Sequence, residues 1–201
     1  MIGEKVGSLN ALSHARDYSK IYRFARDRIN DMLVRDAIRT KRAVREFKDE
    51  PLPGETIEAI LNAGRRAQSS KNTQPWQIIA ITDRETLTAL STCGEWAGHL
   101  AEAALGVALV SPDPGEKFQT MFDLGQCAAY MQLAAWEMGV GSCLASIYEP
   151  EKARAFLGFP QELHLRIAIS FGYPLDVREL ADAPKPGGRK SLEEILHREK
   201  W

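Results

Sequence analysis

The sequence predicts a single domain in which helices and short strands are mixed. Three runs have the length and apolar content of buried strands, namely Gln77 to Thr82, Leu105 to Ser111 and Arg166 to Phe171. Pro112 and Gly172 end the second and third runs. Several stretches around them have the periodicity of amphipathic helices. A length of 201 residues with 44% hydrophobic content is enough for one domain with a substantial core.

Two helical regions are expected before the first strand. Residues His14 to Thr40 mix charged residues with apolar residues at nearly helical spacing, which indicates a helical N-terminal arm. A second helix is expected from Thr56 to about Arg66, where apolar residues share one face. We therefore expect residues 1–30 to form the arm and residues 31–201 to form the domain.

A third predicted helix, from Asp123 to Met138, is apolar on nearly all faces, and Gly139 is well placed to end it. A helix without a polar face must be buried, so we expect it at the centre of the fold or of a dimer interface. Residues Arg178 to Lys190 are rich in Pro, Gly and charge, which predicts an extended C-terminal arm.

Composition excludes several classes of protein. The formal net charge of -1 and pI of about 6.4 argue against nucleic acid or an anionic membrane as the main partner. The start at Met1 lacks the features of a secretory signal, and no apolar run reaches the length of a membrane span, so a cytoplasmic location is expected. Cys93, Cys127 and Cys143 lack disulfide or zinc spacing, and we expect reduced, buried thiols.

A basic cluster follows the predicted N-terminal arm. It contains Arg39, Lys41, Arg42 and Arg45. Guanidinium groups bind phosphate well, because they donate two parallel hydrogen bonds. The alternative is a solvated charge run that ends a helix and interacts favourably with its dipole.

A second polar segment lies about 25 residues further on. It reads Ser69-Ser70-Lys71-Asn72-Thr73-Gln74-Pro75-Trp76. A lone Ser-Ser-x-Asn could be a polar turn that enters a strand. The Gln-Pro-Trp that follows in register makes the longer pattern much more specific, and Pro biases the chain before it to stay extended.

Together the two segments resemble the FMN-dependent nitroreductase family. Its members carry an Arg-Arg-Ser-x-Arg-x-Phe element and then a Ser-Ser-x-Asn-x-Gln-Pro-Trp element. The second matches at every specified position, whereas the first departs at Lys41 and Ala43. The resemblance implies an α+β fold of three layers, with a central, mostly antiparallel sheet between helices, and an intertwined homodimer. It covers roughly Arg39 to the C-terminus.

The resemblance also implies which residues contact FMN. Lys41, Arg42 and Ala43 lie where the family holds the phosphate and ribityl chain. Arg45 lies where a cation faces the pyrimidine edge of the flavin, and such a cation favours the anionic reduced form. Because Ala43 replaces a serine, one hydrogen bond worth about 1 kcal/mol is missing, and binding is expected to survive.

Further contacts are implied by the second element. Ser69, Ser70, Lys71 and Asn72 line the isoalloxazine in such a site, while Trp76 packs beneath the loop as part of the core.

Two later segments complete the expected site. The resemblance places Leu144, Ala145 and Ser146 against the flavin ring, where a backbone amide reaches the reactive nitrogen. Arg189 matches a late basic residue that returns to the phosphate, although a solvent-exposed tail arginine is an equal alternative. The Gly-x-Gly before Leu144 follows a predicted helix instead of a strand, which excludes a Rossmann dinucleotide site.

Other chemistry is not indicated. The four histidines lack metal-ligand spacing, so structural or surface roles are expected, although Trp96 and His99 are candidates to border a substrate pocket. No Gly-x-Ser-x-Gly element supplies a hydrolase nucleophile. No catalytic side chain is expected, because a flavin carries the difficult chemistry itself.

The function implied by the resemblance is an NAD(P)H-dependent flavin oxidoreductase. NADH or NADPH would reduce FMN and leave, and a nitroaromatic, quinone or activated alkene would then be reduced in the same place by a ping-pong mechanism. Alternatives are a dehalogenase or flavin-fragmenting branch of the same superfamily, a non-catalytic FMN-binding protein, and a flavin-free dimer whose basic cluster binds another phosphorylated ligand.

Overall fold

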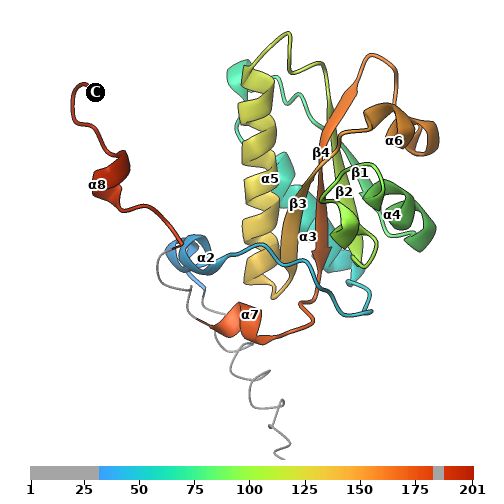
Figure 1. The fold of residues 1–201 in the computed structure, drawn as a ribbon, viewed down its shortest axis with the longest axis horizontal. Coiled ribbons are helices and arrows are strands. Elements are labelled where there is room, and N and C mark those ends of the chain that lie inside the picture. The colour runs from blue at the N-terminus through green and yellow to red at the C-terminus, as the bar shows by residue number, and fades with distance from the viewer. Residues whose placement is uncertain (1–31, 183–187) are drawn as a thin grey trace, which may run out of the picture.

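The computed structural model describes residues 32–182 and 188–201. In chain order its elements are α2 (Val34–Thr40), α3 (Gly54–Arg65), η1 (Ser70–Asn72), β1 (Gln77–Ile81), α4 (Arg84–Ser91), η2 (Gly98–Leu100), β2 (Leu105–Ser111), α5 (Gln119–Glu137), β3 (Gly141–Ser146), α6 (Pro150–Leu157), β4 (His164–Gly172), α7 (Arg178–Ala181) and α8 (Leu192–Ile195). The body has three layers, with a sheet between two sets of helices (Figure 1). This confirms the expected α+β fold class.

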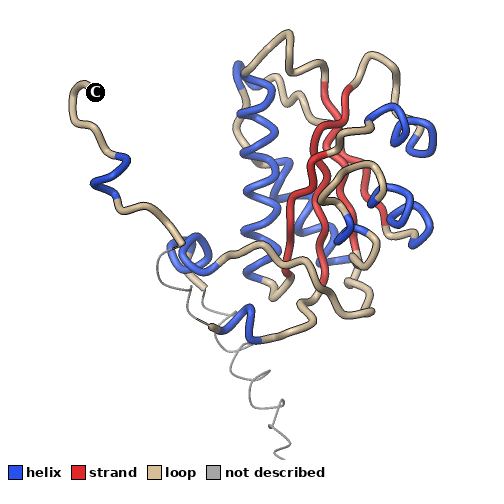
Figure 2. Tube along the Cα trace, in the orientation of Figure 1, coloured by secondary structure: helices blue, strands red, loops and turns tan. Residues whose placement is uncertain are grey.

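The sheet has the strand order β1-β2-β4-β3, and every neighbouring pair is antiparallel. Figure 2 shows the four strands as one twisted layer. β2 is buried along its whole length because it is a central strand covered on both faces. The two outer strands, β1 and β3, each keep one edge that no further strand of the described chain pairs along its length.

Alternate residues of β2 belong to two different cores. Leu105 and Val107 pack with α3 and α5 on one face, whereas Ala108 and Val110 pack with α4, α6 and η2 on the other. This alternation is the period of two expected for a strand between two layers. The sheet therefore holds α5 on one side and the η2 segment on the other, and both sides contribute to the site described below.

The three predicted strands are present within two residues of their expected ends. The predicted second helix is α3, and it begins two residues earlier, at Gly54. The helices α4 and α6 were not predicted from the sequence. Their signals were local: Asp83 caps α4 by accepting a hydrogen bond from the Thr86 amide, and Pro150 opens α6.

α5 differs from its prediction in one respect. It begins at Gln119, four residues earlier than expected, and it ends as expected before Gly139, whose φ is +74°. It was expected to have no exposed face, but a stripe that includes Met121, Phe122 and Tyr130 is exposed in the single chain. Phe122 is 70% exposed. The stripe is apolar, which agrees with the composition that suggested burial.

The two terminal arms are only partly described. Residues 1–31 lie outside the described residues, so the predicted helix from His14 to Thr40 is seen only as α2 at its end. The expected extended arm begins with the short helix α7 instead of an extended chain. Further on, α8 stands away from the sheet near the C-terminus (Figure 1).

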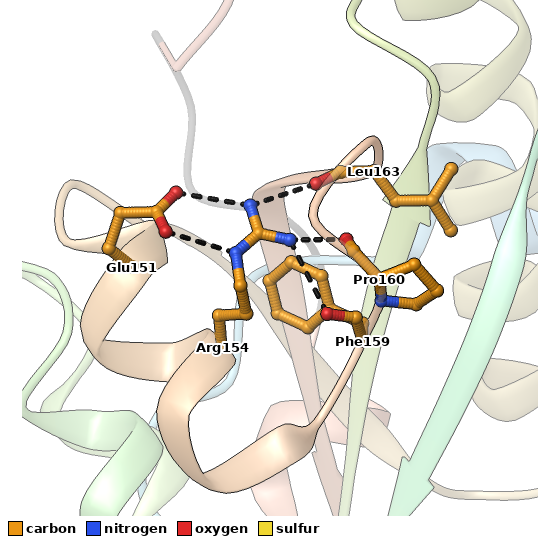
Figure 3. A network of polar contacts seen from close by, with 5 residues as sticks. All are labelled: Glu151, Arg154, Phe159, Pro160 and Leu163. Atoms are coloured by element: carbon orange, nitrogen blue, oxygen red, sulfur yellow. Dashed lines mark hydrogen bonds and ion pairs between the residues drawn. The ribbon is translucent and has the colours of Figure 1, made fainter.

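Arg154 fixes the connection between α6 and β4 (Figure 3). Its guanidinium pairs with both carboxylate oxygens of Glu151 at 3.0 Å and donates to the Leu163 carbonyl at 3.0 Å. It also donates to the carbonyls of Phe159 and Pro160 and stacks over the Phe159 ring at 4.3 Å. One side chain therefore satisfies three carbonyls of this loop, which is a structural role.

Candidate functional site

The segment Lys41–Arg45, here called the basic segment, runs beside the outer edge of β3. Ala43 pairs with Ser142 in a parallel bridge, and the Val44 amide donates to the Ser142 carbonyl at 3.0 Å. Val44 is fully buried, so it anchors the segment, whereas Ala43 and Arg45 face solvent. The segment is thus held in an extended form against the sheet.

A cavity of about 960 Å³ opens between α2, α7 and the chain before α8. Its lining includes three of the predicted phosphate ligands, Lys41, Arg42 and Arg189. Arg189 is far from the other two in sequence, so the fold brings it to them. Arg42 donates to the Asp182 carbonyl at the cavity wall, and Arg189 donates to the Gly188 carbonyl at 2.9 Å.

The cavity is suited to an anion. Within the described part of the chain, Lys41, Arg42 and Arg189 form no ion pair with a carboxylate. Burial lowers the pKa of the Lys41 amine below its ordinary value, with the nearby Cys143 thiol acting in the opposite direction. A partly buried ammonium without a counter-ion is stabilised when an anion binds beside it.

Three acidic residues, Asp176, Glu179 and Asp182, line the same cavity against five basic residues. Hydrogen bonds from Arg178 lower the pKa of the Asp176 carboxyl to about 2, so it is ionised and paired. Burial raises the pKa of the Glu179 carboxyl, while Arg42 acts in the opposite direction. The acidic lining therefore does not cancel the positive charge of the three cations.

The outer edge of β3, along which the basic segment runs, presents main-chain groups. Because the Ser142 carbonyl points outward to Val44, and because alternate residues of a strand point their N–H and C=O groups the same way, the amides of Leu144 and Ser146 also point outward. The Ile147 amide points inward and donates to Arg166 at 2.9 Å. Leu144 and Ser146 are exposed and Ala145 is buried. Outward amides are what the predicted flavin contact at this strand requires.

The segment Ser69–Asn72, here called the turn loop, has unusual backbone geometry. Lys71 and Asn72 have φ values of 52° and 56°, and Gln74 follows with 47°. Three non-glycine residues in the left-handed region within four positions are costly, and such strain is concentrated at functional sites. Trp76 is buried in the main core below the loop, as predicted.

Two hydrogen bonds hold the turn loop in place. The Ser70 amide donates to both carboxylate oxygens of Asp123 at 3.1 Å, and the Ser69 hydroxyl accepts from the Gln74 amide at 2.9 Å. Asp123 is buried in α5. Asp123 was not predicted as a site residue, and its only signal in the sequence was a carboxylate within an apolar helix.

Within one chain, the turn loop and the basic segment lie apart. Asp123 holds the loop near the start of α5, whereas Trp136 donates to Thr40, beside the basic segment, near its end. Thirteen residues of helix separate these two anchors by about 20 Å. The loop also leads into β1, three strands away from β3 across the sheet. In Figure 1 the loop lies beside the upper end of α5, and the chain that follows α2 crosses the lower part of this helix.

A comparison with known protein families shows the family to which the chain belongs. The model of the nitroreductase family matches residues 38–93 and 92–173, which is more than half of the chain. The chain belongs to the nitroreductase family. It is therefore an oxidoreductase by family, as the resemblance of the two sequence elements implied.

Individual nitroreductase relatives agree with this assignment. A protein of Archaeoglobus fulgidus, provisionally named an NADH dehydrogenase/NAD(P)H nitroreductase, is 30% identical over 171 residues, which cover 82% of this chain and 96% of the relative. An NADH dehydrogenase of Thermus thermophilus is 26% identical over 192 residues, covering 78% of this chain and 91% of the relative. An FMN-dependent nitroreductase from Clostridium difficile has a similar solved structure, with a TM-score of 0.73, 26% identity and coverage of 82% of this chain and 98% of that chain.

Other features of this nitroreductase concern its cysteines and possible further ligands. Cys93, Cys127 and Cys143 are free and buried, as predicted. Burial raises the pKa of the Cys127 thiol to about 12, so it is inert. No group of His, Cys, Asp or Glu in the described ranges could hold a metal ion, and none of the described helices has the length and apolar content to span a membrane.

Proposed function

We propose that this nitroreductase is an FMN-dependent enzyme that takes electrons from NAD(P)H and reduces nitroaromatics, quinones or activated alkenes. The observation that carries the proposal is the cavity that gathers Lys41, Arg42 and Arg189 at the start of the basic segment, which continues along the outer edge of β3. When bound, FMN would accept hydride from NAD(P)H and return the electrons to an acceptor in a second, separate step.

Each part of the site has a task in this proposal. Lys41, Arg42 and Arg189 hold the phosphate, whose charge of about -2 suits three cations that form no ion pair with a described carboxylate. Arg45 is exposed beside the β3 edge and stabilises negative charge at the pyrimidine end. The outward amide of Ser146 donates a hydrogen bond to the ring. None of these tasks requires a side-chain acid or base.

The turn loop reaches this site from a second chain in our proposal. Because it lies at the other end of α5 and across the sheet from β3, one chain does not supply both parts to one flavin. The exposed apolar stripe of α5, with Met121 and Phe122, lies along the helix that anchors the loop, and a second copy would bury it. We therefore propose a homodimer with two sites at its interface.

The surroundings of β3 favour a planar acceptor. Gly94 packs so closely on β3 that a Cβ there would lie 2.1 Å from the Ser146 carbonyl oxygen. The Cys93 carbonyl accepts a hydrogen bond from the Tyr148 amide at 2.9 Å. Trp96, two residues after Gly94, and Tyr148, two residues after Ser146, are 75% and 65% exposed. Their rings offer apolar faces beside the ring site, which suits an electron-poor aromatic compound.

An anaerobic visible spectrum tests the proposal. Purified protein is reconstituted with FMN and then given one equivalent of NADH or NADPH. We expect bound flavin to bleach rapidly and to recover its colour when a nitroarene or quinone is added. Bound flavin that stays oxidised would favour a non-catalytic FMN-binding protein or the flavin-fragmenting branch, and absence of FMN binding would overturn the proposal.

A further inference from the structure

Among the described residues, His99 alone has a buried side-chain nitrogen without a hydrogen-bond partner, the ring atom Nε2. His99 lies in η2 and is only 8% exposed. Its other nitrogen, Nδ1, lies 2.7 Å from the Ser170 hydroxyl oxygen in β4. Buried polar atoms nearly always find a partner, so an unpartnered one calls for an explanation such as a missing ligand.

The position of the His99 ring relates it to the proposed flavin site. Ser170 lies opposite Cys143 in the sheet and its hydroxyl donates to the Cys143 carbonyl at 3.4 Å, so the ring packs beneath the β3–β4 pair. Burial lowers the pKa of the imidazole below its ordinary value and Arg45 lowers it further, while the main chain of Leu144 acts in the opposite direction. Leu144 and Arg45 are the residues expected at the ring and at its pyrimidine edge.

We propose that His99 is a further cofactor-contact residue, whose Nε2 completes its hydrogen bonding on the pyrimidine edge of the bound flavin beside Arg45. This inference rests on the proposed FMN function. The pyrimidine edge carries carbonyl oxygens and ring nitrogens, so an imidazole nitrogen finds a complementary partner in either tautomer. Since Nδ1 faces Ser170, Nε2 is directed away from β4, and the packing around this buried ring keeps it in place.

A purely structural role for His99 is the competing explanation. In that case its hydrogen bond to Ser170 would simply join η2 to the sheet, and Nε2 would have no function. The two roles are separated by Ser170→Ala, which removes the bond at Nδ1 and leaves the imidazole in place. His99→Leu removes both nitrogens, whereas His99→Gln keeps a polar group near the Nε2 position.

The experiment uses the full chain with each of the three substitutions. Dissociation constants are measured by titrating apoprotein with FMN and following the quenching of flavin fluorescence, and midpoint potentials are measured with indicator dyes at pH 7. We expect His99→Leu to weaken FMN binding about tenfold and to shift the potential. We expect His99→Gln to stay within threefold of the unsubstituted protein, and Ser170→Ala to lower thermal stability with little change in binding or potential.

Either of two results would overturn the inference. One is a His99→Leu protein whose FMN affinity and midpoint potential are unchanged. The other is a Ser170→Ala protein that loses FMN affinity and shifts its potential as much as His99→Leu does. Where the leucine variant does not fold, His99→Asn takes its place, because the shorter amide reaches toward Ser170 but not to the Nε2 position, and the same outcomes apply. Failure of the unsubstituted chain to bind FMN would instead contradict the proposed function, which keeps the two failures distinct.

Discussion

The backbone amide of Ser70 points at the carboxylate of Asp123 and lies 3.1 Å from both of its oxygens. This contact joins the strained turn loop to the longest helix of the fold. An amide that donates to a charged acceptor makes a stronger hydrogen bond than a neutral pair does. The contact therefore keeps Lys71 and Asn72 in left-handed conformations that they would otherwise leave.

Substitution of Asp123 tests this anchoring role. We expect Asp123→Ala to lower the free energy of unfolding by about 1–3 kcal/mol, because the part-buried hydrogen bond from the Ser70 amide to a charged acceptor is lost. FMN affinity should fall as well, since the loop loses its fixed conformation. Urea denaturation and FMN titration measure the two effects. Unchanged stability and affinity would show that the loop holds its shape without the helix.

The basic segment is tested by Arg42→Ala combined with Arg45→Ala. We expect this double variant to lose FMN while it remains a folded dimer, because both side chains extend from the segment into solvent or the cavity and neither forms an ion pair with a described carboxylate. Absorbance at flavin wavelengths after gel filtration gives the result. Arg65→Ala with Arg66→Ala is the matched control, with the same change of charge at the end of α3. Equal FMN content in both variants would show that the phosphate binds elsewhere.

Asn72 allows side-chain and backbone roles to be separated. Its φ of 56° is tolerated by asparagine and glycine but costs alanine about 1 kcal/mol. We expect Asn72→Ala and Asn72→Gly both to change the rate of flavin reduction by NAD(P)H, and Asn72→Gly to do so with little loss of stability. Stopped-flow reduction and thermal denaturation are the measurements. If the glycine variant reacts normally, the asparagine serves only as a turn residue.

The buried imidazole of His99 predicts a pH dependence of stability. Burial, with a further contribution from Arg45, lowers its pKa below the ordinary 6.5, so the folded chain keeps it neutral. Below about pH 6.5 the unfolded chain binds a proton that the folded chain does not, and the free energy of unfolding therefore falls as the pH falls. For one proton the slope is at most about 1.4 kcal/mol per pH unit.

Urea unfolding of the apoprotein at pH 5.5 and 7.5 measures this dependence. We expect the difference between the two pH values to be smaller in His99→Gln than in the unsubstituted protein. His197→Gln, at an exposed histidine of the C-terminal tail, provides the control. A His99→Gln protein with the full original difference would mean that other groups cause the acid sensitivity.

Trp96 is expected to determine the preference for aromatic acceptors. Trp96 is 75% exposed, and Gly94, two residues before it, packs against the Ser146 carbonyl. We expect Trp96→Ala to raise the KM for a nitroarene about tenfold, since a stacked aromatic pair adds about 0.5–1.5 kcal/mol. The KM for ferricyanide, which has no aromatic ring, should change much less. Phe156→Ala on α6 controls for the loss of an exposed aromatic ring. Equal changes for both acceptors would argue against stacking.

The strands were predicted well because the residues that determine where a strand begins and ends are close together in the sequence. β2 was predicted with the bounds that it has, because a short apolar run between turn residues is characteristic of a buried central strand. The same holds for the stop of α5 at Gly139. The helices α4 and α6 were missed, although Asp83 and Pro150 are the usual residues at such starts. Because α4 and α6 contain many polar residues, their few apolar residues did not show a clear helical spacing.

The site was less predictable because its contacts join distant parts of the chain. Asp123 is 53 residues from Ser70, and His99 is 71 residues from Ser170, so neither pair leaves a local pattern. The resemblance named the basic segment and the turn loop, but nothing in the sequence showed that they lie at opposite ends of α5. That separation depends on helix length and strand order, which only the folded chain defines.

The distance between the basic segment and the turn loop has a consequence for alleles of the gene. In a dimer whose sites each combine the basic segment of one chain with the turn loop of the other, damage to Arg42 and damage to Asn72 would affect different halves of a site. A cell with one allele of each kind would form mixed dimers, in which one site carries both defects and the other carries none. Two such inactive alleles would complement each other, whereas two alleles damaged in the same segment would not.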